Sequence, residues 1–190
     1  MRSRTVWLLA VTWLAACAAG ETSLRARPSG DPLAELDAAT LHAQGKTLAR
    51  SGDLVRAEQY LRAAVARGFP PEEVTPLLID VCLRASRYGA ALGYAQAAVE
   101  RRPEDWRVRL LAASLLHYAV HDSGRARVEL ETIVSQAPEE PMPRWLLGVV
   151  LADGLGQRRA AAAQFRRYLA LDPQGRHAAD ARAALARRAP

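Results

Sequence analysis

Several residue types are rare or missing in this sequence. Asparagine is absent, Lys46 is the one lysine, and only four histidines and two cysteines occur among 190 residues. Four histidines are few for a metal site, and His117 and His121, which are four residues apart, have no evident third ligand. Strand-forming valine, isoleucine and threonine are sparse, whereas the helix formers alanine and arginine dominate. The composition therefore favours an all-α protein without a metal.

The positive charge is modest and dispersed. Lys and Arg total 26 against 20 Asp and Glu, a formal charge of +6. Basic residues alternate with acidic ones at helical spacing, and no run of five or six like charges occurs. This pattern is typical of a solvated helix surface and argues against nucleic-acid binding.

The sequence carries no motif of a known enzyme class. It has no Gly-x-Ser-x-Gly, no Walker-type phosphate loop and no His-Glu-x-x-His. Gly154-Leu155-Gly156 lacks the third glycine and the preceding strand of a dinucleotide-binding fingerprint. We therefore predict a protein that is not an enzyme and needs no cofactor.

The beginning of the sequence has the features of an export signal. Arg2 and Arg4 precede an apolar run that, at about 12 residues, is too short to span a membrane. The run ends in Leu14-Ala15-Ala16-Cys17, which resembles the lipobox of bacterial lipoproteins. The resemblance implies cleavage after Ala16, so that residues 1–16 are the signal peptide, and acylation of the Cys17 thiol.

The resemblance also implies a location. Cys17 is followed directly by Ala18 and Ala19 and not by an aspartate, which implies lipid anchoring at the periplasmic face of the outer membrane. Residues 17–31 are polar, contain Pro28 and Gly30 and show no periodicity, so we expect a flexible tether between lipid and domain. With Cys17 acylated, Cys82 has no intrachain partner, and we expect a buried thiol.

A repeat with a period near 34 residues occupies most of the remaining sequence. Four sets of equivalent positions, which we call columns, recur with this period. They are Ala57, Ala91, Ala126 and Ala161; Leu48, Cys82, Leu116 and Leu151; Phe69, Pro103, Pro138 and Pro173; and Gly45, Ile79, Ala113 and Gly148. The last of these columns precedes the alanine column by 12, 12, 13 and 13 residues. The third and fourth units therefore carry one extra residue in their internal turn.

This period and its small-residue columns resemble the tetratricopeptide repeat. The resemblance implies an all-α, right-handed solenoid of about four helical hairpins in a domain of residues 32–173. The expected hairpins cover residues 38–71, 72–105, 106–140 and 141–175, followed by a capping helix and tail at 176–190. Alanine and glycine would allow the two helices of a hairpin to cross closely. The sequence departs from the family pattern where the first helix usually begins with an aromatic residue, because Leu41, Thr75, Arg109 or Arg144 stands there.

In such repeats the first helix of each hairpin lines a concave groove that binds a peptide or a partner's helix. Counting along the helices gives the inward-facing candidates His42, Lys46, Arg50, Asp80, Arg84, Leu110, Ser114, His117, Tyr118, Trp145, Val149 and Asp153. The first half of this set is basic and the second half apolar with two aromatics, which suits a ligand with an acidic and an apolar end. Family members that clamp a terminal carboxylate use paired Asn and Lys, and a chain without Asn does not fit that specificity.

These observations together predict an interaction protein. We expect a membrane-anchored adaptor that assists assembly of an envelope complex such as a pilus or a secretion machine. The alternative is an accessory subunit of a cell-wall enzyme complex.

Overall fold

The computed structural model describes residue 33 and residues 35–187. The predicted lipobox, Leu14, Ala15, Ala16 and Cys17, and the predicted tether at residues 17–31 lie outside this range. The described residues form nine α-helices and one π-helix, and no strand. No helix among them combines the length and the apolar character that crossing a membrane requires.

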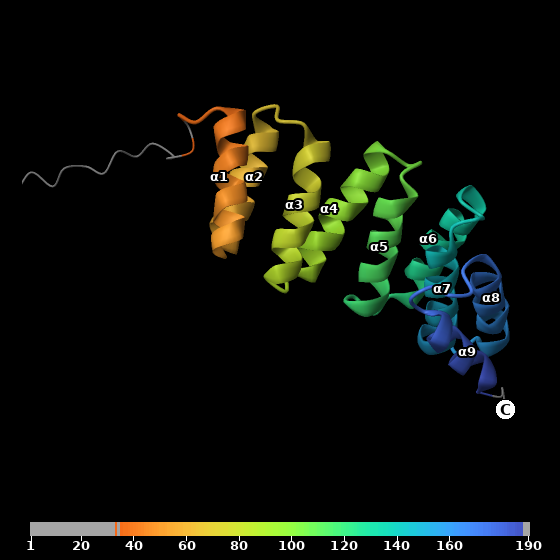
Figure 1. Ribbon diagram of the computed structural model, residues 1–190. Helices are drawn as coiled ribbons and strands as arrows, with labels where there is room; N and C mark the ends of the chain where they lie inside the picture. Colours follow the sequence, from red (N-terminus) through yellow and green to blue (C-terminus); the bar gives the residue numbers. More distant parts are fainter. Residues whose placement is uncertain (1–32, 34, 188–190) are drawn as a thin grey trace, which may run out of the picture. The chain divides into compact units, whose positions relative to one another are not determined.

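The helices pair into hairpins in chain order (Figure 1). They are α1 (Ala38–Ser51), α2 (Leu54–Ala66), α3 (Pro71–Arg84), α4 (Tyr88–Arg101), α5 (Trp106–Tyr118), α6 (Ser123–Gln136), α7 (Pro141–Val149), the π-helix η1 (Val150–Gly154), α8 (Arg158–Leu171) and α9 (Ala178–Ala186). Each helix packs against the next one along the chain. The predicted all-α class and the four hairpins are confirmed.

The four hairpin turns share one hydrogen bond and one backbone conformation. In each turn, the backbone N–H of the residue before the second helix donates to a carbonyl in the Leu48 column. The donor and acceptor pairs are Asp53 and Leu48, Arg87 and Cys82, Asp122 and Leu116, and Gln157 and Leu151. These pairs are five residues apart in the first two hairpins and six apart in the last two. The predicted extra residue is therefore present in both later turns.

A residue with positive φ completes each of these turns. The four residues are Gly52, Ser86, His121 and Gly156, with φ of 86°, 56°, 60° and 66°. Glycine adopts this conformation freely, whereas an L side chain is strained there. The exposed His121 is thus a turn residue, and the side chains of Asp53 and Asp122 cap the helices that follow their turns.

Small residues lie where the two helices of a hairpin cross. Ala57, Ala91, Ala126 and Ala161 are all buried. A Cβ at Gly45 would come within 2.8 Å of Leu61 Cγ, and a Cβ at Gly148 within 2.6 Å of Phe165 Cε1. Both glycines are therefore required by close approach of the second helix, as the columns predicted.

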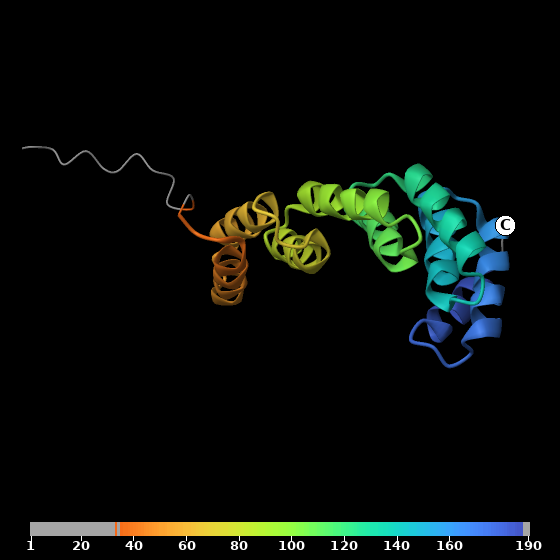
Figure 2. The ribbon, with the colours of Figure 1, turned by 90° about the horizontal axis from the view of Figure 1, so that it is seen from above.

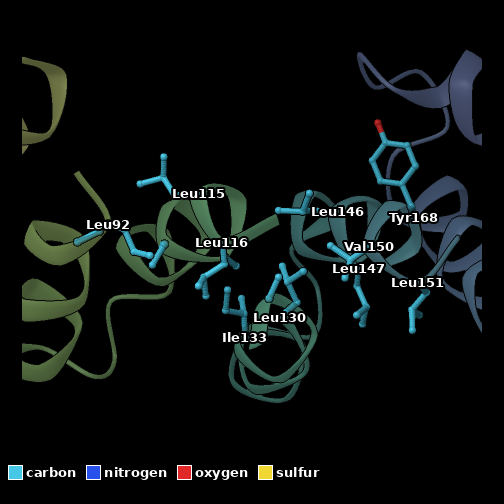
Figure 3. Packing of buried hydrophobic residues seen from close by; sticks show 14 of the residues in the cluster. Leu92, Leu115, Leu116, Leu130, Ile133, Leu146, Leu147, Val150, Leu151 and Tyr168 are labelled. Atoms are coloured by element: carbon cyan, nitrogen blue, oxygen red, sulfur yellow. The ribbon is translucent and has the colours of Figure 1, made fainter. Parts of the chain in front are cut away.

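The core follows the chain in two clusters of buried side chains. One cluster joins α1, α2 and α3, and the other extends from Ile79 and Cys82 of α3 to α9. Figure 3 shows leucines of α5 and α7 together with Leu130 and Ile133 of α6 in this second cluster. Cys82 is buried as expected, and burial, together with the negative charge of Glu58, raises the pKa of its thiol.

Arg109 and Arg144, two of the residues that stand where the resemblance implies an aromatic, have a structural role of their own. Arg109 pairs with Glu129 at 2.7 Å and donates to the Pro103 carbonyl at 3.0 Å. Arg144 donates in the same way to Gln164 and to the Pro138 carbonyl. In the third and fourth hairpins, arginine thus links the first helix to the second helix and to the preceding proline-containing loop.

Helix α9 covers the end of the fourth hairpin (Figures 1 and 2). It packs on α8 and buries Ala178 and Ala181. The predicted capping helix is therefore present.

Candidate functional site

A groove of about 750 Å³ lies among the third hairpin, the fourth hairpin and α9. It is lined by His117 and Tyr118 of α5, Trp145 and Val149 of α7, Ala152 and Asp153 of η1, Phe165 of α8, Asp180, Ala183 and Ala184 of α9, and Arg187, the residue after α9. We call it the aromatic groove. Five of the predicted candidates meet here, namely His117, Tyr118, Trp145, Val149 and Asp153.

Tyr118 is the most accessible aromatic side chain of the groove. Its residue is 53% exposed, and its ring meets the His117 ring edge to face with the centroids 4.6 Å apart. His117 is itself held by a 2.9 Å hydrogen bond between Nδ1 and Ser123 Oγ. Burial lowers the pKa of His117 and raises the pKa of Tyr118. At neutral pH both side chains are therefore uncharged, and they present an apolar surface with polar edges.

Trp145 forms the opposite aromatic element of the groove. Its ring stacks on the His177 ring with centroids 3.7 Å apart and planes 17° apart. The backbone N–H of His177 donates to Tyr168 Oη at 3.1 Å, and His177 Nδ1 lies 3.6 Å from Asp180. The segment before α9 thus fixes the indole in place, which reduces the conformational entropy lost when a ligand binds.

The π-helix η1 places Ala152 and Asp153 in the groove wall. The Leu155 N–H donates to the Val150 carbonyl at 3.1 Å, which is the i to i+5 bond of a π-turn. The extra residue of the fourth hairpin is accommodated here. A Cβ at Gly154 would overlap Ser123 Oγ, so Gly154 allows η1 to approach the start of α6.

The remaining predicted candidates lie outside the residues that line this groove. Asp80 and Arg84 form an i, i+4 ion pair at 3.6 Å on the surface of α3. Ser114 donates to the Leu110 carbonyl at 2.8 Å within α5, and Leu110 packs against the core.

The basic candidates of the first hairpin are carried by α1. His42 packs on Phe69 with ring centroids 4.2 Å apart, and burial lowers its pKa. Lys46 lies one turn further along α1, and Arg50 is exposed near its end.

Sequence reasoning missed the contribution of α9. The sequence predicts only a capping helix for Asp180, Ala183, Ala184 and Arg187, yet these residues form one wall of the groove. A signal was present, because the small residues of this helix recur at helical spacing and leave room beside Trp145.

Comparison with known proteins supports the fold. No family model matches the sequence, and no curated protein matches it either. Among solved structures, the chain is similar to YrrB, described as a TPR protein with an unusual peptide-binding site. The identity is 20%, the TM-score is 0.63, and the match covers 77% of this chain and 74% of YrrB.

Two further structures are similar to the same extent. MamA from Desulfovibrio magneticus matches with 19% identity and a TM-score of 0.62, over 77% of this chain and 84% of that one. A tetratricopeptide repeat protein from Parabacteroides merdae matches with 20% identity and a TM-score of 0.68, over 78% of this chain and 58% of that one. The chain therefore has the tetratricopeptide repeat solenoid fold.

Proposed function

We propose that the protein is a non-catalytic adaptor that binds an extended peptide or a helix of a partner protein in the aromatic groove. The observation that carries the proposal is the preformed groove, in which Tyr118 is exposed and Trp145 is fixed by His177. Tyr and Trp are typical anchors of protein interfaces, because they bury a large apolar area and keep a polar edge. The peptide-binding site for which YrrB is described is consistent with this use of the fold.

The residues of the groove are better suited to binding a partner than to catalysing a reaction. His117 is held by Ser123, and the charged groups of the lining are Arg187 and the carboxylates of Asp153 and Asp180. Aromatic and aliphatic side chains make up most of the remaining lining, as expected for a site that recognises side chains of a partner.

We further propose that the adaptor is anchored at the periplasmic face of the outer membrane through acylated Cys17. There it would assist assembly of an envelope complex such as a pilus or a secretion machine. The support for this part is the order of residues in Leu14-Ala15-Ala16-Cys17 behind a short apolar run.

The test is crosslinking in living cells, followed by purification of the protein and identification of what is bound. The double variant Tyr118→Ala, Trp145→Ala should lose the specific partner. Tyr88→Ala, Trp106→Ala is the matched control, because it removes the same residue types from outside the groove. Retention of the partner by the groove variant would place binding elsewhere. The absence of any specific partner would overturn the adaptor function, and a cell-wall enzyme as partner would favour the alternative role of accessory subunit.

A further inference from the structure

A second cavity adjoins the aromatic groove and is dominated by arginine. It has a volume of about 460 Å³ and is lined by Arg158, Arg159 and Arg166 of α8 and by Arg187 after α9. Ala161, Ala162, Phe165 and Leu185 add apolar surface to its lining. We call this cavity the arginine pocket.

The positive charge of the arginine pocket exceeds its negative charge. None of its four guanidinium groups has a carboxylate within 4.0 Å among the described residues. Some arginines elsewhere in the described chain are paired, for example Arg109 with Glu129 and Arg87 with Glu58, whereas exposed ones such as Arg62 and Arg107 are not, so it is the clustering of four unpaired arginines around one cavity that sets the pocket apart. Asp153 is the one acid that lines the pocket. The pocket therefore has a strong local excess of positive charge in a chain whose charges are otherwise mixed.

Two of the arginines lie where the helix dipole makes a positive charge unfavourable. Arg158 and Arg159 are the first two residues of α8, at the positive end of the helix dipole. The residue before them, Gln157, makes no side-chain capping bond. By contrast, α3 begins with Glu72 and Glu73 in its first turn. Cations at a helix start are unfavourable in the free protein, and a bound anion would reverse that effect.

The arginine pocket and the aromatic groove share a wall. Ala152, Asp153, Phe165, Ala184 and Arg187 line both cavities, so one continuous ligand can occupy the two together. The groove alone contributes the aromatic rings of Tyr118 and Trp145 and the carboxylate of Asp180, which repels acidic side chains, whereas Arg158, Arg159 and Arg166 line the arginine pocket alone. Acidic groups of such a ligand would therefore lie in the arginine pocket and its apolar groups in the groove.

We propose that the arginine pocket selects partner segments in which acidic residues adjoin an aromatic or large aliphatic residue. The inference rests on the proposed peptide-binding function and adds its specificity. Planar guanidinium groups bind carboxylates through paired, charge-assisted hydrogen bonds, and four of them surround this cavity. A peptide satisfies both cavities, because its backbone carries the two kinds of side chain at adjacent positions.

The test is selection from a library of short random peptides on the detergent-solubilised full-length protein. Selected peptides should contain Asp or Glu next to an aromatic or large aliphatic residue. The pocket variant, Arg158→Gln, Arg159→Gln, Arg166→Gln, should bind the same peptides about 10-fold more weakly at low salt. In a fresh selection it should retain the apolar residue and lose the acidic preference. The difference in affinity should shrink as salt screens the charges.

The control variant is Arg62→Gln, Arg107→Gln, Arg176→Gln. It removes the same charge from exposed positions outside both cavities and should select and bind like the wild type. Circular dichroism and thermal unfolding of each variant separate lost binding from lost folding. Arg158→Gln and Arg159→Gln remove cations from a helix start, and Arg166 is exposed within α8, so the pocket variant should remain folded.

The other outcomes are distinguishable. Peptides that depend on Tyr118 and Trp145 but show no acidic preference would overturn this inference and leave the proposed function standing. A library without any binder would overturn this inference, whereas the proposed function would still be decided by the crosslinking experiment. Arginine-dependent binding to phosphatidylglycerol vesicles or to a DNA oligonucleotide, without selection of acidic peptides, would assign the pocket to phosphate groups and overturn the peptide specificity.

Discussion

At the scale of single residues, glycine has opposite effects at different places in this chain. Gly52 has φ of 86° in the first hairpin turn, whereas Gly93 lies inside α4. A Cβ at either position would meet nothing within 4 Å. Only backbone conformation therefore distinguishes the two sites.

We expect Gly52→Ala to lower the free energy of unfolding by about 1 kcal/mol, because an L side chain is strained at positive φ. Gly93→Ala should raise it by up to about 1 kcal/mol, because alanine is the better helix former. Urea unfolding followed by circular dichroism measures both changes. If the two variants shift the midpoint in the same direction, the conformation assigned to the first turn is wrong.

Tyr94 contributes to stability through a buried carboxylate. Its hydroxyl donates to Glu58 at 2.9 Å, and Arg87 donates to the other oxygen of Glu58, which is only 6% exposed. Tyr94→Phe removes one of these bonds and leaves the charge in place. At neutral pH we expect a loss of about 1.5 kcal/mol in the free energy of unfolding, the typical value for a hydrogen bond to a charged group.

The same substitution should alter the dependence of stability on pH. Burial, with the Glu58 hydrogen bond second, raises the pKa of Tyr94 from 10.0 to about 12. The unfolded chain therefore releases this proton at lower pH than the folded chain, and stability is lost as pH rises from 10 through 12. The phenylalanine of the variant has no proton to release, so the stability difference between wild type and variant should narrow in this range. Urea unfolding at neutral pH and within the range measures the two differences, and a constant difference would contradict the raised pKa.

At the scale of secondary-structure elements, the crossing of the two helices in a hairpin depends on paired volumes. Gly148 faces Phe165 in the fourth hairpin, and the corresponding columns of the third hairpin hold Ala113 and Leu130. Gly148→Ala should destabilise the protein by about 1–3 kcal/mol through overpacking, because its Cβ would lie 2.6 Å from Phe165 Cε1.

A second substitution tests the volume argument. The double variant Gly148→Ala, Phe165→Leu recreates the pair of the third hairpin and should be more stable than the sum of the two single effects predicts. A double-mutant cycle by thermal or urea unfolding should give a favourable coupling of about 0.5–3 kcal/mol. Strictly additive effects would show that the two residues do not oppose each other across the hairpin.

The hairpins could be predicted because each one uses the same local arrangement of residues. Small residues recur where helices cross, and prolines recur two residues beyond the ends of α4, α6 and α8. The change of spacing from 12 to 13 also located the extra residue correctly. A repeat reveals such features because each hairpin contacts mainly its neighbours, so the same requirements act on each column.

The site was less predictable, because it depends on contacts that do not repeat. The column spacing is 13 in both the third and the fourth hairpin, so it does not distinguish the end of α5 from the π-turn η1, which places Asp153 in the groove. The arginine pocket combines residues of α8 with Arg187 after α9, and α9 has no equivalent in the earlier hairpins. Helical counting alone gave the basic candidates Lys46 and Arg50. The excess positive charge of the arginine pocket depends instead on which arginines form ion pairs.

At the scale of the whole molecule, the proposed function depends on attachment of the folded domain to a membrane. No helix among residues 35–187 is long and apolar enough to cross a bilayer. The proposed acylation of Cys17 would supply this attachment, because each buried CH₂ of an acyl chain contributes about 0.8 kcal/mol and two or more chains give durable anchoring.

Cys17→Ala removes the thiol that the lipid would occupy. We expect the variant to accumulate at precursor size, without incorporation of a fatty-acid label, and to leave the detergent phase in which the wild type is recovered. Cys82→Ala is the matched control, since it removes the buried thiol of α3 and should leave labelling and partitioning unchanged. Identical labelling and partitioning of wild type and Cys17→Ala would exclude the lipid anchor. The groove, which is built entirely from α5 to the residue after α9, would then serve a protein that reaches its partner by another route.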